Sequence, residues 1–544
     1  MKRKYIFISG GVISGLGKGI TAASLGAILK SFGLKVAPIK CDAYVNIDAG
    51  TVRPQEHGEV FVTADGIETD QDLGHYERFL GESVPRENYI TTGQIYQEII
   101  RKERNFEYGG EDVEVVPHVP EEMIRRFKVA GDKSNADIVL IEIGGTVGEY
   151  QNILFIEANR IMKVRDHEDV IHIHVAYLPT PPSIGEMKSK PAQLSVRMLN
   201  ETGIQPDFLV ARAEHYLDEP RKARLSMFCN LEPEDVISNP DMPSIYMVPK
   251  VLDEQGLGEK VLKKLDIKPK KKKDLKDWYS LAESIEKINA SSKKVRIGIV
   301  GKYQKVGDYK LEDAYVCVME SIKHAAWKFG VKPEVVWFNT EEIEENGVDS
   351  ALKDLDGIIV PQGWGSRGVE GKIETIRYAR ENKIPYLGLC FGMQMAVIEF
   401  GRNVLGLKNA NSVEADPKTP YPVVHIMPEQ KEYLAKRQYG GTIRLGAWPC
   451  AIKPKTKLFE QYKKDLVHER HRHRYEFNNE FRQKYEEAGM VFSGTSPDGN
   501  LVEAIELPQH PFFIGTQFHP EYQSYPFDPN PVFMGFLKAC LDEK

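Results

Sequence analysis

Residues 8–21 read ISGGVISGLGKGIT, and this stretch decides the fold of the N-terminal half. It follows an apolar run and precedes a helical pattern, so it forms a strand–loop–helix turn. A Walker A loop reads G-x-x-x-x-G-K-[ST] and holds phosphates through backbone N–H groups and a lysine. Gly17 and Lys18 match this pattern, whereas Val12 replaces its first glycine and Gly19 its hydroxyl residue. The stretch is therefore either an unusual phosphate-binding loop or a plain glycine-rich turn.

The composition of the loop favours phosphate binding. A tight turn needs one or two glycines, but five glycines and a lysine lie between Gly10 and Gly19. A helix N-terminus that follows small residues offers free N–H groups and a favourable dipole to a polyphosphate. Lys18 adds a positive charge at the same place.

The chain is long enough for several domains. At roughly 150 residues per domain, its length suggests three or four domains, or two large ones. A lysine-rich break at residues 268–294 also carries apolar residues at helical spacing, and we read it as a linker with a helix. We expect one domain at residues 1–267 and another at residues 295–544. Both alternate short apolar runs with helical stretches, which is typical of parallel sheets covered by helices.

The overall composition excludes several classes of protein. Charged residues make up 28% of the chain and hydrophobic residues 41%, and no apolar run approaches the ~20 residues of a membrane span. The N-terminus lacks the features of a signal peptide, so we expect a cytoplasmic protein with no membrane partner. A formal net charge of −7 gives no reason to expect nucleic acid. Six dispersed cysteines without a C-x-x-C pair indicate neither a disulfide framework nor a zinc site.

Two carboxylates in the N-terminal half are candidates for magnesium, which binds hard oxygen ligands together with substrate phosphates. Glu142 ends a strongly apolar run and precedes two glycines, which is the position of a Walker B carboxylate. Asp72 lies in the acidic stretch ETDQDLGHYERF, residues 68–79, where spacing alone does not choose it over Asp70.

A different chemistry is indicated in the C-terminal half. The stretch PYLGLCFGMQ, residues 385–394, places Cys390 in the G-x-C-x-G pattern of a nucleophile elbow, at a helix N-terminus that favours the thiolate. A lone cysteine is more often a small buried hydrophobe. However, GTQFHPEY adds His519 and Glu521 after another apolar strand, a general base with an orienting carboxylate. The two motifs predict nucleophilic catalysis by Cys390.

These residues carry a resemblance to known families. Cys390 in GLCFGMQ with His519-Pro-Glu521 resembles the class I, triad-type glutamine amidotransferases, which hydrolyse glutamine to glutamate and ammonia. The two halves in this order resemble the CTP synthase family across essentially the whole chain, through the motifs GGVISGLGKG, DLGHYERF, EIGGTVG, KSKPAQ, GLCFGMQ, ANSVE, GGTIRLG, ERHRHRYE and FHPEY. The resemblance implies a P-loop-type, dethiobiotin-synthetase-like parallel-sheet domain followed by a class I glutamine amidotransferase α/β domain.

The resemblance also implies a reaction. ATP phosphorylates the uracil O4 of UTP, and ammonia from the glutaminase half displaces phosphate to give CTP. Lys18, with Mg²⁺ held by Asp72 and Glu142, would stabilise charge on the transferring phosphoryl group. It further implies CTP as feedback inhibitor, GTP as allosteric activator and a homotetramer. The sequence does not locate the GTP site, for which Arg367 is one candidate.

Site residues follow from the same resemblance. ATP would be held by Gly15, Leu16, Gly17, Lys18, Gly19, Ile20, Lys40, Asp72, Asp241 and Met242. UTP, and CTP in an overlapping site, would be held by Ser14, Glu149, Tyr150, Gln151, Lys188, Ser189, Lys190, Pro191, Ala192, Gln193 and Arg224. Glutamine would be held by Gly363, Phe391, Gly392, Met393, Gln394, Glu414 and Arg474. Within this last set, Gly363 and the N–H of Phe391 would form the oxyanion hole.

The chain departs from the family pattern at several of these positions. The family commonly shows Lys-Thr-Lys-Pro-Thr-Gln at KSKPAQ, a lysine at Arg224, and Asp-Ile-Glu at residues 149–151. Where the family commonly has Pro-Gly-Gly-Phe-Gly, this chain has PQGWG at residues 361–365. Gln362 and Trp364 are therefore expected to reshape the edge of the glutamine pocket. The details of CTP feedback are accordingly open.

Three points remain open. His57, in EHGEVF, resembles a residue at the ammonia passage and would otherwise be read as an ordinary loop histidine. Lys40 would otherwise be read as a surface lysine. The rival functions are a ParA- or MinD-like partitioning ATPase, which lacks a glutaminase half, and a different amidoligase such as a cobyrinate amidase, which product analysis with UTP would separate.

Overall fold

The computed structural model describes residues 2–53, 58–302, 305–306, 309–310, 312–348, 352–427, 430–436 and 438–542. The chain separates into two compact units, which we call unit 1 (residues 1–48 and 75–285) and unit 2 (residues 49–74 and 286–544). The helix expected in the linker is α11, Lys276–Ala290. The sequence did not indicate that residues 49–74 leave unit 1 and belong to unit 2.

Unit 1 is built on a seven-stranded sheet in the order β5-β2-β6-β1-β7-β8-β9, and all neighbouring strands pair in parallel. Strands such as β6 are buried along their whole length, as in a sheet whose two faces are both covered. The strands are β1 Lys4–Gly11, β2 Val36–Asp42, β5 Tyr89–Thr91, β6 Ile138–Ile143, β7 Val170–Leu178, β8 Phe208–Ala213 and β9 Val236–Pro240.

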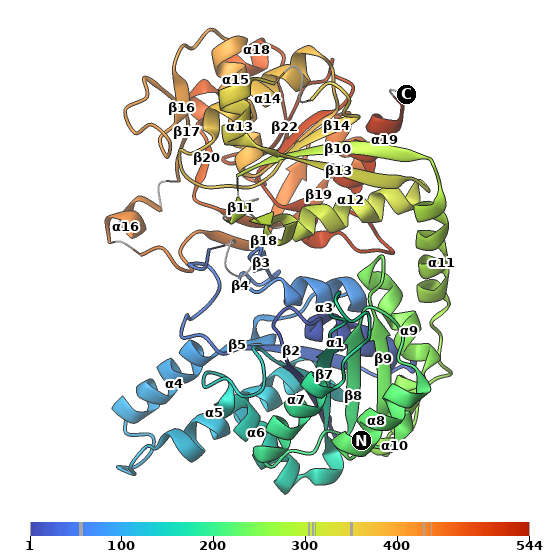
Figure 1. The fold of residues 1–544 in the computed structure, drawn as a ribbon. Coiled ribbons are helices and arrows are strands. Elements are labelled where there is room, and N and C mark those ends of the chain that lie inside the picture. Colours follow the sequence, from blue (N-terminus) through green and yellow to red (C-terminus); the bar gives the residue numbers. More distant parts are fainter. Residues whose placement is uncertain are drawn as a thin grey trace. The chain divides into compact units, whose positions relative to one another are not determined.

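Helices connect these strands, and two more helices, α9 and α10, follow the last strand β9 (Figure 1). They are α1 Lys18–Ser31, α3 Asp72–Leu80, α4 Thr92–Arg104, α5 Val115–Lys133, α6 Ile153–Arg165, α7 Lys190–Glu201, α8 Glu219–Cys229, α9 Val248–Glu254 and α10 Leu257–Lys264. Strand β1 lies in the middle of the sheet, and its carboxyl end leads into the glycine loop, where ligands of parallel sheets bind. Across the described parts of the chain, none of the helices has both the length and the apolar character needed to cross a bilayer.

Unit 2 contains a nine-stranded sheet in the order β13-β10-β14-β15-β23-β22-β21-β18-β19. The pairs from β13 to β23 are parallel, and those from β23 to β19 are antiparallel. The parallel pairing predicted for this half is present from β13 to β23, and the sequence pattern did not indicate the antiparallel strands that extend the sheet. Strands β21 and β22, and likewise β22 and β23, are joined by short connections, which allow only antiparallel pairing.

The bounds of the unit 2 elements are as follows. The sheet strands are β10 Lys294–Gly301, β13 Lys332–Asn339, β14 Gly357–Val360, β15 Tyr386–Leu389, β18 Arg444–Ile452, β19 Leu466–His473, β21 Val491–Thr495, β22 Val502–Glu506 and β23 Phe513–Thr516. The smaller strands are β3 Phe61–Val62, β4 Glu68–Thr69, β11 Lys305–Val306, β12 Tyr309–Lys310, β16 Ala410–Ser412, β17 Tyr421–Ile426 and β20 Tyr475–Phe477. The helices are α12 Val316–Lys328, α13 Thr340–Asn346, α14 Val369–Glu381, α15 Phe391–Asn403, α16 Gln430–Ala435, α17 Lys457–Tyr462, α18 Arg482–Glu487 and α19 Pro531–Asp542.

Residues 49–74 are bound to the rest of unit 2 by buried polar contacts. Arg470 is almost fully buried and donates a hydrogen bond from Nη1 to the carbonyl oxygen of Val62 at 3.0 Å. Arg472 pairs with the buried carboxylate of Glu68, with 2.8 Å between Nε and Oε1. A buried charge is tolerated only when it is paired in this way, so these contacts hold the segment in one place.

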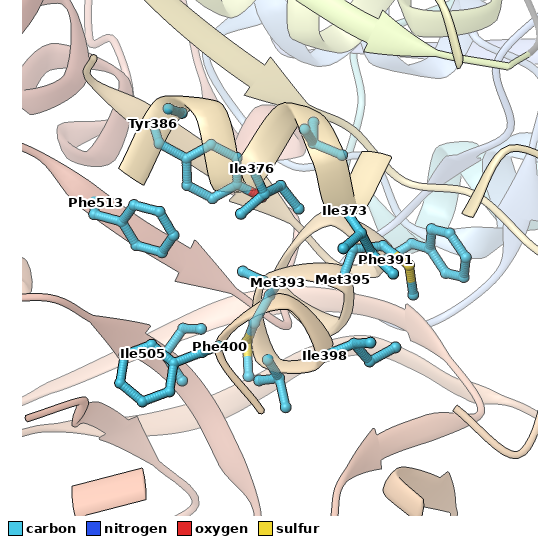
Figure 2. Close-up of a cluster of buried hydrophobic side chains, with 14 of the residues drawn as sticks. Ile373, Ile376, Tyr386, Phe391, Met393, Met395, Ile398, Phe400, Ile505 and Phe513 are labelled. Atoms are coloured by element: carbon cyan, nitrogen blue, oxygen red, sulfur yellow. The ribbon is translucent and has the colours of Figure 1, made fainter. Parts of the chain in front are cut away.

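Helix α15 forms the centre of a hydrophobic core in unit 2. Figure 2 shows Met393, Ile398 and Phe400 of this helix packed among side chains from α14 and from strands of the sheet. Its residues are buried from Phe391 through Gly401, and a helix that is apolar on all sides belongs inside a protein. Gly392 lies so close to β14 that an added Cβ would lie 2.0 Å from the carbonyl oxygen of Val360.

We therefore expect Gly392→Ala to lower the free energy of unfolding of unit 2 by at least ~1–3 kcal/mol, because the methyl group would force the start of α15 away from β14. Urea titration followed by tryptophan fluorescence measures this, since four of the five tryptophans (327, 337, 364 and 448) belong to unit 2. Gly440→Ala is the matched control, because its Cβ would meet only Thr51 Cγ2 at 3.5 Å. Equal stability of the two variants would contradict the predicted clash.

Candidate active site

Cys390 lies at the turn between β15 and α15 and has a strained backbone. Its φ is 50° and its ψ is −97°, a conformation that costs a non-glycine residue ~1–3 kcal/mol. Its N–H donates to the carbonyl oxygen of Thr516 at 2.7 Å, and its side chain is 5% exposed. Gln517 Nε2 lies 3.5 Å from the sulfur, and the carbonyl oxygen of Arg472 lies 3.7 Å from it. This is the geometry of a nucleophile elbow.

His519 and Glu521 form a buried pair after β23, the parallel neighbour of β15. Glu521 Oε1 lies 2.7 Å from His519 Nδ1, and both side chains are almost completely buried. His519 Nε2 has no hydrogen-bond partner among the described residues, and the imidazole stacks on Tyr522 with ring centroids 4.8 Å apart. Burial disfavours the imidazolium, but the charges of Glu521 and Cys390 outweigh it and raise the pKa of His519 to about 10. The histidine is therefore suited to hold a proton beside a thiolate.

A small cavity adjoins Cys390. Six of the predicted residues line it, namely Gly363, Cys390, Phe391, Gln394, Glu414 and Arg474. Trp364, expected at the edge of the pocket, is also part of the lining, as are His473 and Tyr475. The sequence had not singled out these last two, although the motif ERHRHRYE contains both. Gly392 and Met393 are not among the lining residues, and the side chain of Met393 lies in the core (Figure 2).

The cavity carries opposite charges. Glu414 accepts a hydrogen bond from the N–H of Gly365 at 2.7 Å, and burial raises the pKa of its carboxyl group. Arg474 is buried and donates to Thr442 Oγ1 at 3.0 Å, while its Nη1 has no hydrogen-bond partner among the described residues. A carboxylate and an unsatisfied guanidinium in one small cavity match the ammonium and carboxylate groups of an amino acid.

In unit 1, the glycine loop adopts a conformation that suits phosphate binding. Val12, Gly15 and Gly17 all have φ between 67° and 87°, the left-handed region that occurs in the backbone turns of anion-binding loops. Lys18 Nζ donates to the carbonyl oxygen of Gly145 at 2.9 Å. The lysine chain runs so close to Gly10 that an added Cβ there would lie 2.7 Å from Lys18 Cδ, so a larger residue at position 10 would displace the lysine side chain.

Arg212 is a residue of this region that the sequence did not indicate. It lies on β8 and donates from Nε to the carbonyl oxygen of Leu16 at 3.2 Å. It also pairs with Asp241, with 2.8 Å between Nη2 and Oδ1. One arginine thus ties the glycine loop to a residue predicted to lie by the ATP base.

Lys40 and Glu142 are buried next to each other, with 3.4 Å between Lys40 Nζ and Glu142 Oε1. Tyr76 also contacts the second oxygen of Glu142. The reading of Lys40 as a surface lysine is wrong, because its side chain is buried and its ammonium group pairs with the buried carboxylate of Glu142. A carboxylate at this strand end fits a cation that also binds phosphate oxygens. Asp72 begins α3 and falls in unit 2, so its magnesium role stays a prediction from the resemblance.

Most of the predicted pyrimidine-nucleotide residues are exposed or half-buried in unit 1, whereas Ser189 and Ala192 are buried. Lys188 pairs with Glu186 at 2.6 Å, and Tyr150 is 94% exposed. Glu149 Oε1 accepts a hydrogen bond from the N–H of Thr146 at 3.0 Å. KSKPAQ spans the start of α7, and Arg224 lies exposed on α8. His57 lies outside the described residues.

Known proteins match the chain over both units. The family model described as CTP synthase N-terminus matches residues 4–267, and that of glutamine amidotransferase class-I matches residues 310–539. A CTP synthase of Caldanaerobacter subterraneus is 51% identical over 543 residues and one of Bacillus subtilis is 48% identical over 540, each match covering 99% of both chains. The glutaminase domain of Trypanosoma brucei CTPS with bound acivicin is 38% identical, with a TM-score of 0.42, and the match covers 46% of this chain and 94% of that chain.

The raised pKa of His519 predicts that the free energy of unfolding depends on pH. A group whose pKa rises from 6.5 to about 10 on folding contributes stability that is complete below pH 6.5 and is lost as the pH rises through 10. Glu521→Gln removes the charge that stabilises the imidazolium, so its loss of stability should be largest below pH 6.5 and smallest above pH 10. Thermal unfolding across this pH range, with Glu487→Gln as an exposed control in unit 2, measures the difference. A loss that does not change with pH would contradict the assignment.

Proposed function

The chain belongs to the CTP synthase family, and on that basis we propose that it aminates UTP to CTP with ATP and with ammonia released from glutamine. The observation that carries the glutaminase part is the cavity that Cys390 lines together with the oppositely charged Glu414 and Arg474. The buried Lys18 at the glycine loop supports the ATP-dependent part. The relatives, matched over 99% of the chain, do not favour a partitioning ATPase or another amidoligase.

Glutamine hydrolysis follows from the geometry around Cys390. The thiolate attacks the side-chain amide carbon, the C–S bond forms, and the carbonyl electrons move to oxygen, where the N–H groups of Gly363 and Phe391 would receive the oxyanion. Collapse breaks the C–N bond, and His519 gives its proton to the departing ammonia. Glu521 keeps the imidazole oriented through Nδ1. Water then hydrolyses the thioester to glutamate.

UTP amination is assigned to unit 1. A uracil carbonyl oxygen is a poor leaving group, and phosphorylation of O4 by ATP makes it a good one. Lys18 would stabilise charge on the transferring phosphoryl group, and Lys40 beside Glu142 would lie near the same phosphates. Glu142, with Asp72 by resemblance, would hold magnesium, which supplies charge neutralisation to the phosphates.

The regulatory and assembly properties rest on the resemblance. We propose CTP as a feedback inhibitor that overlaps the UTP site, GTP as an allosteric activator, a homotetramer and a cytoplasmic location. Arg367, the candidate residue for GTP, donates to the carbonyl oxygen of Lys302 at 3.0 Å, a contact that gives it a structural role as well.

The two chemistries are separable by mutation. Cys390→Ala should lose CTP synthesis from glutamine but keep it with ammonium chloride at a pH that supplies free ammonia, because external ammonia needs no thioester. Lys18→Ala should lose both activities by ~10²–10³-fold, since the phosphoryl charge is left without compensation. Asp72→Ala and Glu142→Ala should behave like Lys18→Ala. CTP formation from UTP is measured with each nitrogen source.

The outcomes of this comparison are distinct. Ammonium rescue of Cys390→Ala together with no rescue of Lys18→Ala supports the proposal. Retained glutamine use by Cys390→Ala would give the nucleophile to another cysteine. Near-normal CTP production by Lys18→Ala would remove the phosphate role of the loop.

Mutation of Arg224 tests whether this residue, which stands where the family commonly has a lysine, binds the pyrimidine nucleotide. A guanidinium can make two hydrogen bonds to a phosphate or ribose where an ammonium is a point charge, so Arg224→Ala should raise the KM for UTP and weaken inhibition by CTP. Arg197→Ala, which removes another exposed arginine of unit 1 paired with Glu201, is the matched control. Unchanged KM and unchanged inhibition would place Arg224 outside the site.

A further inference from the structure

Two buried lysines of unit 2 have no role in the mechanism described so far. Lys302 follows strand β10 and is 5% exposed, and Lys372 lies on α14 and is fully buried. A buried ammonium group is costly unless its surroundings stabilise the charge, so two of them in one place require an explanation.

Both ammonium groups lie against the same two structural features. Lys302 Nζ lies 5.2 Å from the ring centroid of Phe391, and Lys372 Nζ lies 4.9 Å from it. Lys372 Nζ also lies 3.4 Å from the carbonyl oxygen of Pro361, and Lys302 Nζ contacts that of Trp364. Both lysines therefore bind the loop of residues 361–367 and pack on the first residue of α15.

Gly363 is enclosed between the two lysines. An added Cβ at this glycine would lie 3.3 Å from Lys302 Cε, 3.4 Å from Lys372 Nζ and 3.5 Å from Phe391 Cδ1. Gly363 and Phe391 are the two residues whose N–H groups are assigned to the oxyanion. Both lysine side chains thus lie beside the two residues that carry these donors.

The charges around Lys372 indicate what its ammonium group stabilises. Among the described residues no carboxylate forms an ion pair with it, and the charged groups that act on it are Lys302 and Cys390. Burial lowers the pKa of Lys372, Lys302 lowers it further, and a negative charge on Cys390 raises it. Burial likewise lowers the pKa of Lys302, to about 8. A negative charge at the sulfur or at the nearby oxyanion therefore favours the charged form of Lys372, and Lys372 favours that negative charge in return.

We propose that Lys302 and Lys372 are positioning residues of the glutaminase: they fix the loop that presents Gly363 and supply positive potential behind the oxyanion hole. The inference rests on the proposed glutaminase function. Neither lysine transfers a proton. The thiolate charge moves to the carbonyl oxygen as the C–S bond forms and returns as the C–N bond breaks, and the lysines stabilise the negative charge at both places.

The test compares Lys372→Met and Lys302→Met with Lys457→Met. Lys457 is the matched control, because its ammonium group also donates to a carbonyl oxygen of unit 2, that of Pro511 at 3.2 Å, but lies on α17. Each of the first two variants should lower kcat for glutamine hydrolysis about 10- to 100-fold and leave the KM for glutamine within about 2-fold, because the charge acts on the transition state. Alkylation of Cys390 by iodoacetamide should also slow, as followed by mass spectrometry.

CTP synthesis with ammonium chloride provides the internal control. Its retention in both variants, with the fall in kcat, supports the proposal. The proposal is overturned if Lys372→Met and Lys302→Met keep a normal kcat, or if Lys457→Met shows an equal fall. It is also overturned if the two variants lose the ammonium-dependent activity, or if their KM for glutamine rises while kcat stays unchanged. Failure of the proposed function is seen separately, as retained glutamine use by Cys390→Ala.

Discussion

The left-handed conformation of Cys390 is the constraint on which the active site of unit 2 depends. The residue has a φ of 50° and is held there because its N–H binds the carbonyl oxygen of Thr516 on β23. The same strand leads to His519, so one hydrogen bond fixes both the nucleophile and the strand that delivers its base. Gly392 then lets α15 begin directly against β14. The strain of one residue is offset by a core packed around the whole of α15.

Unit 2 is completed by residues from the N-terminal part of the chain. Glu59, in the segment 49–74, accepts a hydrogen bond from Gln362 Nε2 at 2.6 Å, next to the predicted oxyanion donor Gly363. Tyr522, which stacks on His519, donates to the carbonyl oxygen of Val60 at 3.1 Å. The environment of the predicted triad is therefore set partly by residues that precede the rest of unit 2 by more than two hundred positions in the sequence.

The sequence was sufficient for motifs whose chemistry is local. Cys390 between two glycines and His519 two residues before Glu521 could be read directly, because the elbow and the triad require those residues in those places. The burial of Lys40 and the contact of Arg212 with the glycine loop depend on which strands become neighbours in the sheet. A local sequence pattern does not contain that information. The same holds for the antiparallel half of the unit 2 sheet and for the insertion of residues 49–74. Lys302 directly follows an apolar strand and a glycine, a signal that could have been noticed, whereas Lys372 is one charged residue among several on α14.

The central claim is that one chain releases ammonia from glutamine and attaches it to UTP. The most direct test supplies glutamine labelled with ¹⁵N at the side-chain amide, together with ATP, UTP and Mg²⁺, and measures the label in the product by mass spectrometry. The proposed function predicts CTP that carries ¹⁵N at its exocyclic amino group, formed in a one-to-one ratio with glutamate and ADP. Glutamate formation without labelled CTP, or CTP formed without loss of glutamine, would contradict it.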